Sequence, residues 1–210
     1  QTDFATMIGD NTFLGQGAWA DISGTGFHSF TMSIQGAVNE AGAGGTISVR
    51  GGTYAETVSI NRGLTLAGAG MNATSITGGM VLTGTINDLN LSGFSVTGTG
   101  AGNAVIRGSG ASVTNLTMDQ VRVDAGSVAG RSGISGGHYG GDISITNSEF
   151  LNINHWVVFD TRSGAGGPGA GTNISSFLFA DNLIDNVKGG ITVRQNDGGT
   201  GSVTISGNTV

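Results

Sequence analysis

An apolar pattern recurs six times between residues 64 and 210 of this 210-residue chain. Each copy places inward-facing residues at its first and third positions, and two further ones at its sixth and eighth positions. The copies begin 25, 27, 27, 34 and 26 residues apart, and the one long interval contains the glycine-rich segment 164–171. A nearly fixed period of this length indicates a repeat architecture. The six copies begin at Leu64, Leu89, Leu116, Ile143, Phe177 and Val203.

The spacing within each copy predicts short strands joined by bends. Alternating apolar residues mark a strand with one buried face, and the extra residue after the third position breaks that alternation. A ring of short strands can bury its inner side only if another ring stacks above or below it. The sequence therefore predicts an all-β fold, a right-handed single-stranded parallel β-helix (a solenoid), with a short N-terminal capping helix.

Small and polar residues occupy the predicted bends. Gly93, Asn147, Asp181 and Gly207 each stand at the fifth position of a copy, where a positive φ angle would suit them. The sixth position holds asparagine in the last two copies. These two side chains could form an asparagine ladder, in which stacked amides satisfy one another, or they could be two independent turn residues. They are Asn182 and Asn208.

The first 45 residues do not contain the repeat. Apolar residues at three- and four-residue spacing (Ile34, Ala37, Val38 and Ala41) predict one buried helix face, and the glycines that follow end the helix. Such a helix could cover the open end of a repeat stack. The apolar-rich arm before it either folds back along the stack or packs on a neighbouring molecule. The expected division is an arm at 1–29, a capping helix and lead-in at 30–45, and the β-helix at 46–210.

Part of this sequence resembles the pectin-lyase-like superfamily. The segments 45–56, 58–60 and 64–70 look like the entry turns of that superfamily, and Val203–Val210 is similar to its generic repeat. The resemblance covers roughly residues 30–210. It implies a right-handed parallel β-helix but no particular activity, because this scaffold carries lyases, hydrolases, epimerases, adhesins and inert stalks.

Composition and charge exclude several classes of partner. The formal net charge is −6, and the eight Lys and Arg residues are scattered singly, so we expect no binding to nucleic acid or to an anionic membrane. No apolar stretch approaches the length of a bilayer span, so we expect no membrane insertion. Few charges, 41 glycines and no cysteine are typical of bacterial surface proteins, which predicts a secreted or cell-surface location.

Enzymes that resemble this fold act on acidic polysaccharides from one outer face. Lyases of this kind use calcium held by clustered Asp residues, together with an Arg that serves as base. The counterparts here are Asp160 and Arg194, which we expect at similar heights on adjacent repeats and take as the catalytic candidates. An ion-pair ladder without catalysis is the alternative interpretation. Because no Asp-rich run appears, we expect no metal site and no cofactor, and calcium is the alternative that no motif supports.

An aromatic pair marks a second candidate site. His155 and Trp156 precede the glycine-rich segment, and a tryptophan beside charged side chains can bind a sugar by ring stacking and bidentate hydrogen bonds. Arg162 and Asp197 would complete such a carbohydrate-binding site. The alternative is that Trp156 simply covers the core where the repeat widens.

Three classes of function follow from these observations. We favour an extracellular structural or adhesive solenoid, either a cell-surface stalk or a subunit that assembles end to end into a fibre, over an enzyme. A polysaccharide lyase, hydrolase or epimerase and a passive carbohydrate-binding module are the alternatives. The last copy ends in an inward position at Val210 with no capping element after it, so we expect self-association there or continuation of the chain.

Overall fold

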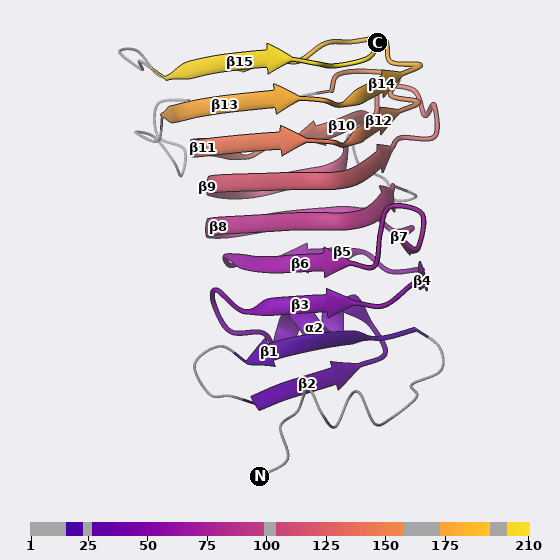
Figure 1. Cartoon of the computed structure of the whole chain (residues 1–210), viewed down its shortest axis with the longest axis vertical. Coiled ribbons are helices and arrows are strands. Elements are labelled where there is room, and N and C mark those ends of the chain that lie inside the picture. Colours follow the sequence, from indigo (N-terminus) through magenta and orange to yellow (C-terminus); the bar gives the residue numbers. More distant parts are fainter. Residues whose placement is uncertain (1–15, 23–26, 99–103, 158–172, 194–200) are drawn as a thin grey trace.

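The computed structural model describes residues 16–22, 27–98, 104–157, 173–193 and 201–210. These residues form an all-β structure with one large, mostly parallel sheet and one short helix, and the strands stack along the long axis of the molecule (Figure 1). The elements are β1 (Ala18–Ile22), β2 (Phe27–Thr31), α2 (Ile34–Glu40), β3 (Thr46–Val49), β4 (Gly52–Tyr54), β5 (Val58–Ile60), β6 (Leu64–Gly68), β7 (Thr74–Ile76), β8 (Met80–Thr97), β9 (Ala104–Asp124), β10 (Ser132–Ser135), β11 (His138–Thr146), β12 (Glu149–Leu151), β13 (Ile174–Ala180), β14 (Leu183–Asp185) and β15 (Ser202–Ser206).

The six repeat starts lie in vertical register, as the sequence predicts. Each start pairs with the next one across parallel strands, and each third position does the same. The side chains at both positions are buried in every copy except the last. Each repeat therefore supplies one layer of a continuous apolar interior. The first column is Leu64, Leu89, Leu116, Ile143, Phe177 and Val203, and the second is Leu66, Leu91, Met118, Ile145, Phe179 and Ile205.

The pattern in the first copy is wrong after its third position. The spacing places Ala69 and Met71 inward, whereas Ala69 is exposed and Met71 is partly exposed. A turn closed by hydrogen bonds to the carbonyl of Gly70 follows β6 and delays the next strand. Thr74 and Ile76 take the buried positions instead, and Ile76 pairs with Val96.

The predicted bends adopt the predicted backbone conformation. Gly93, Asn147, Asp181 and Gly207 all have positive φ angles, between 49° and 68°. Gln120 occupies the same position in the copy that begins at Leu116, with a φ angle of 53°. In these five copies the fifth position adopts this conformation whichever residue fills it, whereas Gly68 at the fifth position of the first copy does not.

At the N-terminal end of the stack a helix covers the interior, and a hairpin extends the sheet, with β2 as its edge strand. Strands β1 and β2 pair antiparallel, and β1 pairs antiparallel with β3, so part of the predicted arm extends the sheet. The predicted helix is confirmed as α2, and its apolar face is buried. Ser33 caps it, and the carboxylate of Glu56 accepts the backbone N–H groups of Ile34 and Gln35 at 2.8 and 2.9 Å.

The C-terminal end of the stack is open among the described residues. Val203 and Ile205 of β15 continue the two inward columns, yet they are 53% and 56% exposed. Phe177 and Phe179, directly below them, are each 1% exposed. The interior is covered by α2 at the N-terminal end, whereas the inward side chains of the last repeat are about half exposed. No described helix has the length and apolarity needed to cross a membrane.

Candidate functional site

The His155–Trp156 corner follows β12, where the chain leaves the stacked strands. Ile153 and Val157 on either side are buried, which turns the two aromatic side chains outward. Trp156 is 44% exposed, and its ring lies 5.6 Å from that of His155 in an edge-on arrangement. The structure therefore places this predicted pair on the surface and next to each other.

Contacts from two neighbouring repeats fix the corner. The Nδ1 atom of His155 lies 3.0 Å from the Oγ atom of buried Ser132, within hydrogen-bond distance. The backbone N–H of Gly133 donates to the carbonyl of Trp156 at 3.0 Å. A Cβ atom on Gly189 would lie 2.9 Å from the Trp156 ring and 2.3 Å from the His155 carbonyl. Only glycine fits at that position, so the indole is held between repeats rather than hanging free.

An exposed, positioned indole can bind the apolar face of a sugar ring. The polar partners predicted for it, Arg162 and Asp197, lie outside the described residues, as do the catalytic candidates Asp160 and Arg194. Their roles remain predictions. Ser132 is too deeply buried to meet a polymer, so its contact with His155 positions the imidazole instead of activating a nucleophile.

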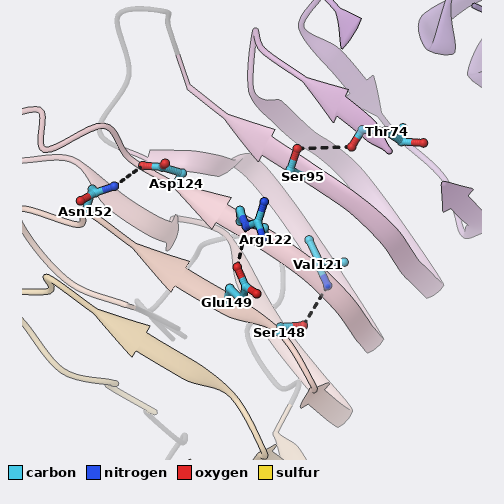
Figure 2. A network of polar contacts seen from close by, with 8 residues as sticks. All are labelled: Thr74, Ser95, Val121, Arg122, Asp124, Ser148, Glu149 and Asn152. Carbon is cyan, nitrogen blue, oxygen red and sulfur yellow. Dashed lines mark hydrogen bonds and ion pairs between the residues drawn. The ribbon is translucent and has the colours of Figure 1, made fainter. Parts of the chain in front are cut away.

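Polar side chains link successive repeats along the bends (Figure 2). The Oγ atom of Ser148 accepts the backbone N–H of Val121 at 3.1 Å, and Asn182 then accepts the N–H of Ser148 at 2.9 Å. Asn208 accepts the N–H of Asn182 at 2.9 Å. The asparagine-ladder interpretation is confirmed for Asn182 and Asn208, whose side chains also contact each other at 3.1 Å. Ser148 extends the ladder by one repeat.

Two more links run through the same face of the stack. Arg122 and Glu149 form an ion pair of 2.5 Å, with both side chains about a quarter exposed (Figure 2). Asn152 donates to Asp124 at 3.1 Å and accepts from Asn186 at 2.9 Å. The sequence analysis missed these links, although Arg122 and Glu149 share the seventh position of consecutive copies. Repeat position alone could have revealed them.

Tyr139 lies inside the stack and not at a surface site. Its side chain is 1% exposed, and burial raises the pKa of its hydroxyl well above the usual range. The buried, neutral Tyr139 side chain therefore cannot contact a polysaccharide. The described residues contain no group of three His, Cys, Asp or Glu side chains arranged to hold a metal ion.

No protein-family model, no curated protein and no solved structure matches the chain. The geometry of the stack and the exposed indole are therefore the observations that bear on function.

Proposed function

We propose that the chain is a right-handed parallel β-helix of the pectin-lyase-like kind, and that it serves as a secreted or cell-surface structural rod. Such a rod is a stalk or a fibre subunit that presents or connects other parts. A proposed capping unit at 30–45 precedes the β-helix at 46–210, and the arm at 1–29 contributes to the closed end. The role requires no cofactor.

One observation carries this proposal: the repeats form one continuous stack of paired strands. The inward columns keep their register through six copies, so the repeats form one continuous elongated stack. The same columns end in half-exposed Val203 and Ile205.

Electron microscopy of the purified chain and of the native cell surface tests this role. We expect straight rods of uniform width, joined at their ends or standing out from the surface. Globular, separate particles in both preparations would contradict it.

A second candidate function rests on Trp156. Its ring is exposed but immobilised by Gly189 and His155, which suits passive carbohydrate binding. Quenching of tryptophan fluorescence by oligosaccharides of acidic and neutral sugars measures this binding. We expect Trp156→Ala to abolish the effect and Trp19→Phe, which removes the other tryptophan, to preserve it. Equal quenching in both variants would exclude Trp156 as the platform.

The lyase hypothesis is tested separately. Incubation with pectate or alginate gives unsaturated products with characteristic absorbance if the chain is a lyase. Loss of that signal in Arg194→Ala would support the predicted catalytic pair, and absence of signal in the wild-type chain would exclude a lyase acting on these polymers.

A further inference from the structure

The outer face of the main sheet carries two columns of short side chains. In a strand, the residues next to buried positions point to the opposite face, so the residues after the first and third inward positions face outward. Strand pairing sets them in line through the layers that are stacked in Figure 1. We call these two lines the outer columns. The first is Thr46, Thr65, Asn90, Thr117, Ser144, Leu178 and Thr204, and the second is Ser48, Ala67, Ser92, Asp119, Thr146, Ala180 and Ser206.

The composition of the outer columns is unusual for an exposed sheet face. Nine of their fourteen side chains are Ser or Thr, and none is Lys, Arg, Glu or an aromatic residue. The surfaces of soluble proteins normally mix charges of both signs among their polar groups. Leu178 is the one large apolar side chain in the columns, so the face lacks the contiguous apolar patch that marks a protein interface. Without an aromatic ring it also lacks a platform on which a sugar can stack.

The outer columns repeat their hydroxyl groups in two directions. Neighbouring layers lie about 4.8 Å apart, and the two columns are about 6.7 Å apart along each strand. The paired backbone fixes these positions, and the threonine side chains have few rotamers, so the grid is ordered before any partner binds. Each hydroxyl can both donate and accept a hydrogen bond. The surface of ice is the complementary partner, because it is an uncharged, rigid lattice of donors and acceptors that repeats on a similar scale.

The carboxylates at this face are engaged in contacts along the stack. Asp119 accepts hydrogen bonds from the Oγ1 atom of Thr146 at 2.9 Å and from the Nδ2 atom of Asn147 at 2.7 Å. Asp88 and Asp142, at the bend before the columns, each accept a hydrogen bond from a side chain of the next layer. These carboxylates therefore belong to the polar links between layers. The remaining hydroxyl groups are what the face presents to a partner.

We propose that the outer columns bind the surface of ice. The inference goes beyond the proposed rod and does not depend on it. Every layer adds one pair of positions to the grid, so the contact with a lattice grows with the number of layers. A single hydrogen bond contributes little beyond the bond to water that it replaces. A partner that repeats with the stack gathers many such contacts, which a dissolved molecule cannot do.

Ice grown slowly in a dilute solution of the purified chain tests the proposal. We expect the wild-type chain to enter the ice and to give the growing crystals facets. Thr117 is exposed and lies in the middle of the first outer column. Thr117→Lys should lower the incorporated fraction about tenfold or more, since a long charged side chain that keeps its water holds the grid away from the lattice. Exclusion of the wild-type chain from ice would overturn the proposal and leave the rod untouched.

Two further variants separate the grid from other causes. Thr83→Lys makes the same change in the first part of β8, which pairs with the start of β9 outside the outer columns, and should bind ice like the wild-type chain. An equal loss in Thr83→Lys and Thr117→Lys, with unchanged far-UV circular dichroism, would show that the outer columns are not the binding face. Asp119→Asn should retain binding, and its loss there would assign the effect to the charge instead of the hydroxyl groups. Adsorption to crystalline cellulose or chitin without entry into ice would overturn ice as the partner.

Discussion

The Oδ1 atom of Asn208 accepts the backbone N–H of Asn182, and the Nδ2 atom of Asn208 donates to the carbonyl of Phe179 one layer below. Asn182 makes the same two contacts with Ser148 and Ile145. Each ladder asparagine therefore satisfies one backbone donor and one backbone acceptor of the previous repeat. The side chain of one repeat completes the backbone of the previous one.

Replacement of Asn182 should destabilise the chain more than replacement of an exposed polar residue does. Asn182→Ala leaves the N–H of Ser148 and the carbonyl of Ile145 without these partners inside the stack, which costs about 1–3 kcal/mol. Asn182→Ser, which reproduces the residue found at position 148, should recover part of the loss. Asn87→Ala removes an exposed asparagine of β8 and serves as control. Urea unfolding measures all three, and equal stability of Asn182→Ala and Asn87→Ala would contradict the ladder's contribution.

Two glycines should respond in opposite ways to the same substitution. A Cβ atom on Gly63 would lie 1.6 Å from the backbone oxygen of Asn87 in the next repeat, so Gly63→Ala must push two layers apart. We expect a loss of about 3 kcal/mol or more in the free energy of unfolding. A Cβ atom on Gly190 would meet no other atom within contact distance. The free energy of unfolding of Gly190→Ala should therefore be unchanged or higher by up to about 0.5 kcal/mol. Thermal unfolding distinguishes the two, and similar melting temperatures would refute the close packing of layers at Gly63.

The closed end depends on one carboxylate from another repeat. Glu56 accepts two of the free N–H groups at the start of α2, where a negative charge is also favourable. Glu56→Gln removes the charge and one acceptor, and should cost about 1 kcal/mol. Glu40→Gln, at the exposed C-terminal end of the same helix, should cost nothing. Hydrogen exchange of the α2 amides is the direct readout, and unchanged protection in Glu56→Gln would show that the carboxylate does not hold the helix.

Alkaline pH should unfold the chain through its tyrosines. Burial raises the pKa of Tyr139, and desolvation raises that of Tyr54 despite its hydrogen bond with Gly17 and the charge of Arg50. The unfolded chain releases these protons near pH 10 while the folded chain keeps them, so their contribution to stability is complete below about pH 10 and is lost as the pH rises beyond it. These are the only two tyrosines in the chain. We therefore expect tyrosinate absorbance to appear together with the loss of circular dichroism, and ionisation in the still folded state would contradict the burial of both hydroxyls.

The repeat could be predicted from the sequence because its spacing obeys simple steric rules. An alternating apolar strand needs a buried face, and the residue at the fifth position needs a positive φ angle. Those two requirements place the starts from Leu64 to Val203 and the bends from Gly93 to Gly207 correctly. The prediction for the first copy was wrong because the turn at Gly70 inserts residues without a recognisable sequence pattern. Met71 was therefore placed at the buried position that Ile76 occupies.

The candidate site could be predicted only in part. The sequence singled out His155 and Trp156 but left open whether Trp156 is exposed or covers the core, and the structure shows both side chains exposed between buried Ile153 and Val157. The contact between Ser132 and His155 joins residues 23 positions apart on different layers, and no local sequence pattern predicts it. The pairs Arg122–Glu149 and Asn152–Asn186 could have been predicted, because the members of each pair share a repeat position.

Ile143 and Phe177 are paired neighbours, although their repeats begin 34 residues apart where Leu116 and Ile143 are separated by 27. The extra length between them leaves the alignment of the strands unchanged. An insertion between these two copies need not change the pairing of the interior strands, so we expect a foreign peptide grafted there to be displayed at a fixed height along the stack. Such a position lets a scaffold of this kind acquire new recognition segments without redesign of its core.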